Sequence, residues 1–285
     1  EEMEKAFALD ETDARVYLEL DQLKKRLNVA VKERWSDMEK HFDLVESRDD
    51  LYLEYVTLLN TLGEPEKALG LIKARKFHQW EGGEGKVAAQ YLTALYQLAK
   101  AAVEKEDYAE AKELLLRAVG EYPHNLGEGK LESGQENNLY YLLGLVQEKL
   151  GEAKDAFESL TRACCGESEP VGMMYYNDQP PEMIYYQGLA YRMLGEEEQA
   201  VRRFQKLVDY GREHIRDDVK IDYFAVSLPD LLIFEENLNE RNRKHCLFMM
   251  SLGLKGLGRI DEAEKCAEEL LAMDNAHQEI RVHDL

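Results

Sequence analysis

The chain has 285 residues, of which 45% are hydrophobic and 33% charged, a composition that supplies a continuous apolar core and excludes wholesale disorder. Its formal net charge of −21 excludes nucleic-acid binding through phosphate neutralisation and disfavours an anionic membrane surface as a partner. No run of about 18 apolar residues occurs, so no segment is predicted to span a membrane.

Helical elements are predicted to recur along the chain with a period of about 44 residues. The anchors are alanines in similar contexts, Ala68, Ala111, Ala156 and Ala200, with spacings of 43, 45 and 44 residues. A fixed period in this range indicates a stack of structural repeats. We therefore predict an all-α, right-handed superhelical solenoid of about six helical hairpins, folded as a single domain over residues 1–285.

In chain order, a degenerate first unit contains Tyr17, Leu20 and a helix around Trp35, and more regular units follow it. An apolar insertion interrupted by Pro229 precedes the last unit, and we expect it to pack on the array as extra helical structure. The predicted units lie near residues 14–47, 49–80, 92–123, 137–166, 181–210 and 244–277, and the insertion covers 211–243.

The unit that ends at Pro123 shows the repeat most clearly. Its first helix has an apolar stripe at i, i+3, i+4 and i+7, formed by Leu95, Leu98, Ala99 and Ala102. Asp107 marks the turn, and Pro123 ends the second helix because proline disfavours helix at the residue before it. This arrangement of small and large residues resembles the tetratricopeptide repeat, which implies paired helices that stack on their neighbours.

The units are longer than an ordinary tetratricopeptide repeat of about 34 residues, and the excess falls between consecutive units. The extra segments cover residues 77–87, 122–137 and 166–182. Because the units stack in register, we expect these segments to emerge side by side along one edge of the array.

The tetrapeptide GEGK occurs in two of these segments, at residues 83–86 and 127–130. It is not a phosphate-binding P-loop, because Trp80 and His124 stand where the first glycine is needed. One interpretation is structural, with a glycine turn, a glutamate near the start of the next helix and a lysine on the first turn of that helix.

The other interpretation is a composite binding surface, because the extra segments and the insertion combine aromatic rings with carboxylates and amides, which bind sugars or peptides. The candidate ligand-binding residues are His78, Trp80, Glu81, Glu84, Lys86, Asn125, Glu128, Lys130, Tyr175, Tyr176, Asn177, Asp178, Asp222 and Tyr223. We expect no independent catalysis, because no nucleophile–base motif such as GxSxG or HExxH is present.

Four cysteines, Cys164, Cys165, Cys246 and Cys266, lack the CxxC spacing of metal ligands, and the histidines are scattered. We therefore predict no metal site and no cofactor, and we expect reduced, partly buried thiols. The opening residues EEMEKAFALDETDARVYLEL have the pattern of helices inside a repeat array, and no initiating Met precedes them. We expect a fragment of a longer chain and a cytoplasmic location.

The extra segments carry a more specific resemblance than the repeat itself. FHQWEGGEGKV, YPHNLGEGKL, YYNDQPPEMIYYQGLAYRMLG and KIDYFAVSLPDLLIFEENLNERNRKHC together resemble the C-terminal helical region of a family of large bacterial proteins of unknown function. Those proteins carry an N-terminal galactose-mutarotase-like β domain, so the resemblance implies a carbohydrate context. Gln79 stands where the family usually has proline, which concerns the local turn alone.

We predict a non-catalytic interaction module that binds a protein segment, or its own N-terminal domain, through a concave face and the loop edge. The acidic balance favours a basic or neutral partner. The alternative is an accessory part of a carbohydrate-active enzyme, in which the loops between units help to form a saccharide site.

Overall fold

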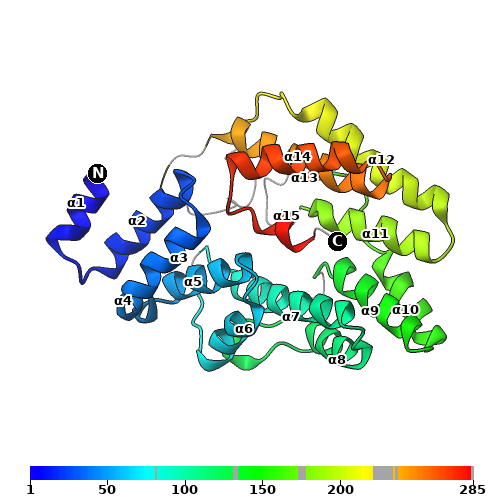
Figure 1. Cartoon of the computed structure of the whole chain (residues 1–285), viewed down its shortest axis with the longest axis horizontal. Helices are drawn as coiled ribbons and strands as arrows, with labels where there is room; N and C mark the ends of the chain where they lie inside the picture. The colour runs from blue at the N-terminus through cyan, green and yellow to red at the C-terminus, as the bar shows by residue number, and fades with distance from the viewer. Residues whose placement is uncertain (81, 131–133, 173–177, 221–233, 235–236, 284–285) are drawn as a thin grey trace.

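The computed structural model describes residues 1–80, 82–130, 134–172, 178–220, 234 and 237–283. Within these residues the chain is helical and contains no β-strand (Figure 1). The elements are α1 (Glu2–Leu9), α2 (Ala14–Arg26), α3 (Val31–Lys40), α4 (Phe42–Ser47), α5 (Asp49–Thr61), α6 (Pro65–Ala74), α7 (Lys86–Glu104), α8 (Tyr108–Val119), η1 (His124–Leu126), α9 (Asn137–Lys149), α10 (Ala153–Ala163), α11 (Pro181–Met193), α12 (Glu197–His214), α13 (Leu238–Gly256), α14 (Ile260–Met273) and α15 (Gln278–Val282).

Consecutive helices from α5 to α14 form hairpins, and each hairpin packs on the next. The pair α7 and α8 shows how the sequence produces this unit. The Asp107 side chain accepts a hydrogen bond from the Glu110 backbone N–H at 3.1 Å and so caps the start of α8. Ala99 and Ala111 are fully buried, and their small side chains let the two helices pack closely.

Close packing of α11 on α12 depends on Gly188. A Cβ atom at this position would lie 2.4 Å from the ring of Phe204, which is fully buried. A Cβ atom on Gly256 of α13 would lie 2.3 Å from the same ring. Glycines on two helices therefore make room for one large side chain on a third, as expected where small residues mark helix crossings.

The predicted all-α superhelical array of stacked hairpins is confirmed. The irregular first unit consists of α2 packed with α3 and α4. The predicted insertion contributes the end of α12 and the start of α13, and its interior at 221–233 and 235–236 lies outside the described residues. In the part of the chain that the structure describes, no helix is long and apolar enough to cross a membrane.

The array curves so far that its first and last units meet. In Figure 1 the arc runs from α2 through α9 and back to α14, and α15 lies in the middle of it. Residues 274–283, which follow α14 and include α15, form what we call the closing segment. The Asn275 backbone N–H donates to Asn28 Oδ1 at 2.8 Å, which joins the turn after α14 to the turn after α2.

Candidate functional site

The first two extra segments pack against each other on one edge of the array. The Phe77 backbone N–H donates to the Asn125 carbonyl at 2.8 Å. The Asn125 amide nitrogen donates to the carbonyls of Ile72 and Arg75 at 2.8 and 2.9 Å, which satisfies acceptors at the end of α6. Asn125 therefore holds one loop to the helix end of the preceding unit.

Glu128 caps a helix of the preceding unit. Its carboxylate accepts hydrogen bonds from the backbone N–H groups of Gly85 at 2.7 Å and Ala88 at 2.9 Å, at the start of α7. A negative charge at a helix N-terminus is favourable because the first N–H groups have no partner within the helix. The second loop therefore stabilises the helix that follows the first loop.

The two GEGK copies consequently differ in structure. Lys86 begins α7, as the structural interpretation predicts for the first copy. The prediction is wrong for the second copy, because α9 begins at Asn137 and Lys130 lies in the loop before it. Lys130 instead donates to the Val119 carbonyl at the end of α8 and pairs with Glu136 at 2.8 Å. Burial raises the pKa of Glu136, and the Lys130 ammonium opposes that rise.

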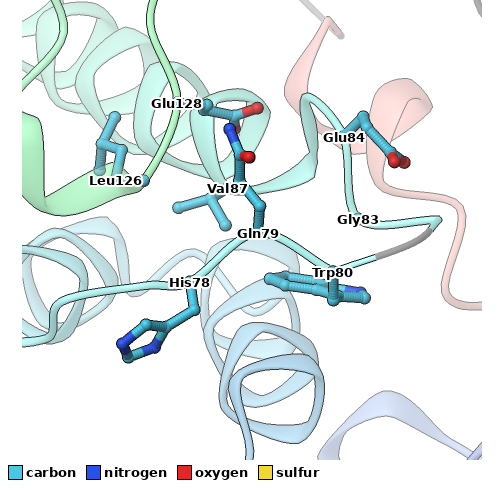
Figure 2. Close-up of a pocket in the computed structure, with 9 residues that line it drawn as sticks. His78, Gln79, Trp80, Gly83, Glu84, Val87, Leu126 and Glu128 are labelled. Carbon is cyan, nitrogen blue, oxygen red and sulfur yellow. The ribbon is translucent and has the colours of Figure 1, made fainter.

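The two loops enclose a pocket of about 370 Å³ (Figure 2). Half-buried Trp80 and exposed Glu84 lie in its lining, and Figure 2 shows the His78 ring pointing away from Trp80. His78 pairs with Asp49, which accepts from the His78 backbone N–H at 2.8 Å and lies 3.1 Å from the ring Nδ1. The full lining is His78, Gln79, Trp80, Gly83, Glu84, Val87, Leu126, Gly127 and Glu128.

The structure brings the candidates His78, Trp80, Glu84 and Glu128 together in the pocket lining. Lys86, Asn125 and Lys130 do not line this pocket. Asp178 is described and half-buried. The other candidates lie outside the described residues, namely Glu81, Tyr175, Tyr176, Asn177, Asp222 and Tyr223. A surface formed by all three loops and the insertion stays a prediction.

A second candidate site lies on the inside of the arc, where the closing segment is bound. The buried Gln278 amide nitrogen donates to Thr61 Oγ1 at 3.1 Å and to the Thr57 carbonyl at 3.2 Å. The Gln90 amide nitrogen donates to Gln278 Oε1 at 2.9 Å. One glutamine thereby bridges α5 and α7, and sequence reasoning missed this role because no local pattern marks it.

Asn275 forms a matching contact one turn earlier in the closing segment. Its amide nitrogen donates to the Asn28 carbonyl at 2.8 Å, and its Oδ1 accepts from the Val31 backbone N–H at 3.0 Å. The Asn28 amide nitrogen donates to the Ala272 carbonyl at 3.0 Å, so the contact is reciprocal. Asn28 has a φ of 57°, a left-handed conformation that asparagine tolerates better than most residues.

The far end of the closing segment docks on α7 and α11. Lys100 Nζ donates to the Val282 carbonyl at 2.9 Å. His283 Nδ1 lies 3.1 Å from the Tyr186 hydroxyl, which lies 2.7 Å from the Tyr96 hydroxyl. Burial lowers the pKa of His283 to about 3, with smaller contributions from Lys100 and His277, so the imidazole is neutral in this contact.

We call the surface that contacts the closing segment the inner face, and it includes Asn28, Val31, Thr57, Thr61, Gln90, Tyr96, Lys100 and Tyr186. A groove of about 820 Å³ continues from it between α2, α5, α7 and α13. Thr57 and Gln90 line this groove and also bind Gln278, while Asp274 of the closing segment lies at its edge. The groove and the bound segment therefore form one continuous surface.

Three of the four cysteines lie in surroundings that disfavour the thiolate. Burial raises the pKa of Cys164 and of Cys246 to about 12 and raises the pKa of Cys266, so these thiols stay protonated and are weak nucleophiles. Among the described residues, no group of three or more His, Cys, Asp or Glu side chains is placed to hold a metal ion.

The tetratricopeptide repeat family model matches residues 93–125 and 182–210. Among solved structures, the chain is similar to a crystal structure of MamA, at 18% identity over 76% of this chain and 92% of that chain, with a TM-score of 0.27. It is also similar to YrrB, titled a TPR protein with an unusual peptide-binding site, at 17% identity over 87% of this chain and 98% of that one, with a TM-score of 0.30. The family match confirms that residues 93–125 and 182–210 of this all-helical chain are tetratricopeptide repeats.

Proposed function

We propose that this chain is a protein-interaction module that binds a short polypeptide segment on its inner face. The observation that supports the proposal is the closing segment, a short stretch of polypeptide held there by side chains from widely separated units. The repeat units supply the rigid curved support on which such a surface is built.

The inner face has the chemistry that a polypeptide ligand requires. Lys100 donates to a main-chain carbonyl, while Thr61 and Gln90 satisfy a side-chain amide. Ile280 and Val282 are buried at 6% and 4% exposure, so apolar contact accompanies the polar contacts. A bound segment would thus be held by main-chain recognition and by selected side chains.

The adjoining groove adds room for a longer ligand. Its volume of about 820 Å³ is in the upper part of the range for ligand sites, about 300–1,000 Å³. A partner protein, or the N-terminal domain that the family resemblance implies, is the proposed source of the segment.

A labelled peptide with the sequence of residues 274–283, DNAHQEIRVH, tests the proposal. We expect saturable binding, followed by fluorescence anisotropy, to the full chain that carries Asn275→Ala and Gln278→Ala in its own closing segment. Adding Gln90→Ala to that chain should weaken binding at least about tenfold, because one buried polar partner is lost. Absence of binding, or binding that ignores the Gln90 substitution, rejects this function.

The loop pocket supports a second candidate, an accessory saccharide site. Trp80 is half-buried and lines the pocket, and the Glu84 carboxylate is exposed beside it. A flat aromatic face with a nearby hydrogen-bond acceptor suits a sugar ring. Calorimetry with a panel of neutral oligosaccharides should then give heat that Trp80→Ala abolishes and Phe157→Ala, at an aromatic residue 62% exposed outside the pocket lining, preserves. No heat with any sugar rejects this candidate.

A further inference from the structure

The closing segment occupies the surface that the proposed function requires. We infer that residues 274–283 act as an intramolecular competitor, which a partner segment of the same pattern displaces from the inner face. That pattern has side-chain amides at its first and fourth positions, Asn275 and Gln278, and aliphatic residues at its sixth and eighth, Ile280 and Val282. The inference rests on the proposed function and adds the chemistry of the partner and a mode of regulation.

Both amides of the pattern have defined partners on the inner face. The Asn275 amide pairs with Asn28 in the first unit, and the Gln278 amide pairs with groups on α5 and α7. A ligand with an amide only at one of these positions leaves polar groups of the inner face without partners, which costs affinity. The spacing of three residues between the amides therefore selects the ligand.

The closing segment also has the properties of a displaceable element. Helix α15 has five residues, far fewer than the roughly 12–15 that an isolated helix needs for marginal stability in water. Its conformation therefore depends on the inner face. Asp274, where the closing segment begins, is held to α14 because its backbone N–H donates to the Leu270 carbonyl at 2.8 Å. Displacement can therefore begin at the other end of the segment, near residue 283.

Attachment to the array gives the closing segment an advantage over a free peptide. A segment on a short tether has an effective concentration on the order of millimolar at its own site. A partner therefore binds an inner face that is mostly occupied, and its apparent affinity falls by the fraction of chains in which the face is open. Weakening the closing segment should recover that affinity without changing the inner face.

The experiment compares three full-length chains with the labelled DNAHQEIRVH peptide. The wild type keeps its closing segment, the Asn275→Ala, Gln278→Ala chain weakens it, and the Asn239→Ala, Gln205→Ala chain removes two amides elsewhere. Asn239 and Gln205 bond to Asp218 and Asp209, outside the inner face. We expect the weakened chain to bind at least about tenfold more tightly than the wild type, and the control to match the wild type.

Equal binding by the wild type and the weakened chain overturns the competition but leaves the proposed function standing. No binding by either chain overturns both. If the weakened chain does not fold, as judged by circular dichroism, hydrogen exchange on the wild type decides the matter. The wild type is saturated with a peptide whose isotope label separates its mass from that of the identical segment in the chain. Displacement should speed hydrogen exchange at residues 278–283 of the chain, and unchanged exchange overturns the inference.

Discussion

At the scale of single residues, side-chain donors complete the ends of the second helices in the hairpins. The last carbonyls of a helix lack partners within it, so donors from neighbouring units stabilise these ends. Each of the helices α6, α8, α10, α12 and α14 receives such a donor at its end. The donors are Asn125 for α6, Lys130 for α8, Asn137 for α10, Asn242 for α12 and Asn28 for α14.

Glu182, near the start of α11, is predicted to make stability depend on pH. Burial raises its pKa to about 8, and Glu279 adds to the rise. Because the pKa is raised on folding, its stabilising contribution is complete below about pH 4.5 and is lost as the pH rises through about 8. Glu182→Gln should therefore be more stable than the wild type at pH 8, by roughly 1–3 kcal/mol, and should lose that advantage at pH 4.5.

Urea unfolding at several pH values measures this difference. Glu158→Gln is the matched control, since that side chain is 64% exposed and pairs weakly with Lys154 at 3.8 Å. Parallel stability curves for the wild type and Glu182→Gln would show that the buried carboxyl does not titrate as its surroundings imply.

Three of the described candidate binding residues, Asn125, Glu128 and Lys130, have partners within the array. All three have the right residue types for ligands, but each bonds to a backbone group of the preceding unit. Composition alone cannot separate these roles, because an amide or carboxylate that caps a helix looks the same as one that binds a sugar. A concave binding face was predicted, but its residues were not, since Gln278 acquires its role through Thr61 and Gln90.

At the scale of helices, the repeat pattern was predictable because it is local. Alanine and glycine recur at fixed positions where helices cross, and the spacing of these residues survives the variation around them. The turn before α9 was not predictable in this way. Lys130 lies in it because the loop packs on the preceding unit, a contact set by the tertiary structure.

Two glycines inside helices should respond oppositely to alanine. Gly188→Ala places a Cβ atom 2.4 Å from the Phe204 ring, and we expect it to cost roughly 1–3 kcal/mol through overpacking. Gly70→Ala in α6 meets nothing within 4 Å, so the better helix propensity of alanine should stabilise the chain by roughly 0.5–1 kcal/mol. Thermal unfolding of both variants measures the contrast, and two shifts of the same sign would contradict the packing of α11 on α12.

At the scale of the whole molecule, the hairpins and the closing segment have different origins. The curvature comes from the stacking of neighbouring units, which each unit determines with its neighbours. Closure comes from residues that are far apart in sequence, such as Asn28 and Asn275. The stacking of hairpins can be predicted from the sequence period. The closure cannot, because it depends on how strongly the whole array curves.

The contact between Asn28 and Asn275 also bears on how the chain folds. An open repeat array has mostly local contacts, so folding can begin in any part of it and spread to neighbouring units. Here the two residues are separated by 247 positions, and their hydrogen bonds form only after every intervening hairpin is in place. The closure entropy of that long loop makes such a contact late and slow to form. The array thus gains a cooperativity between its two ends that neighbour-to-neighbour stacking alone does not provide.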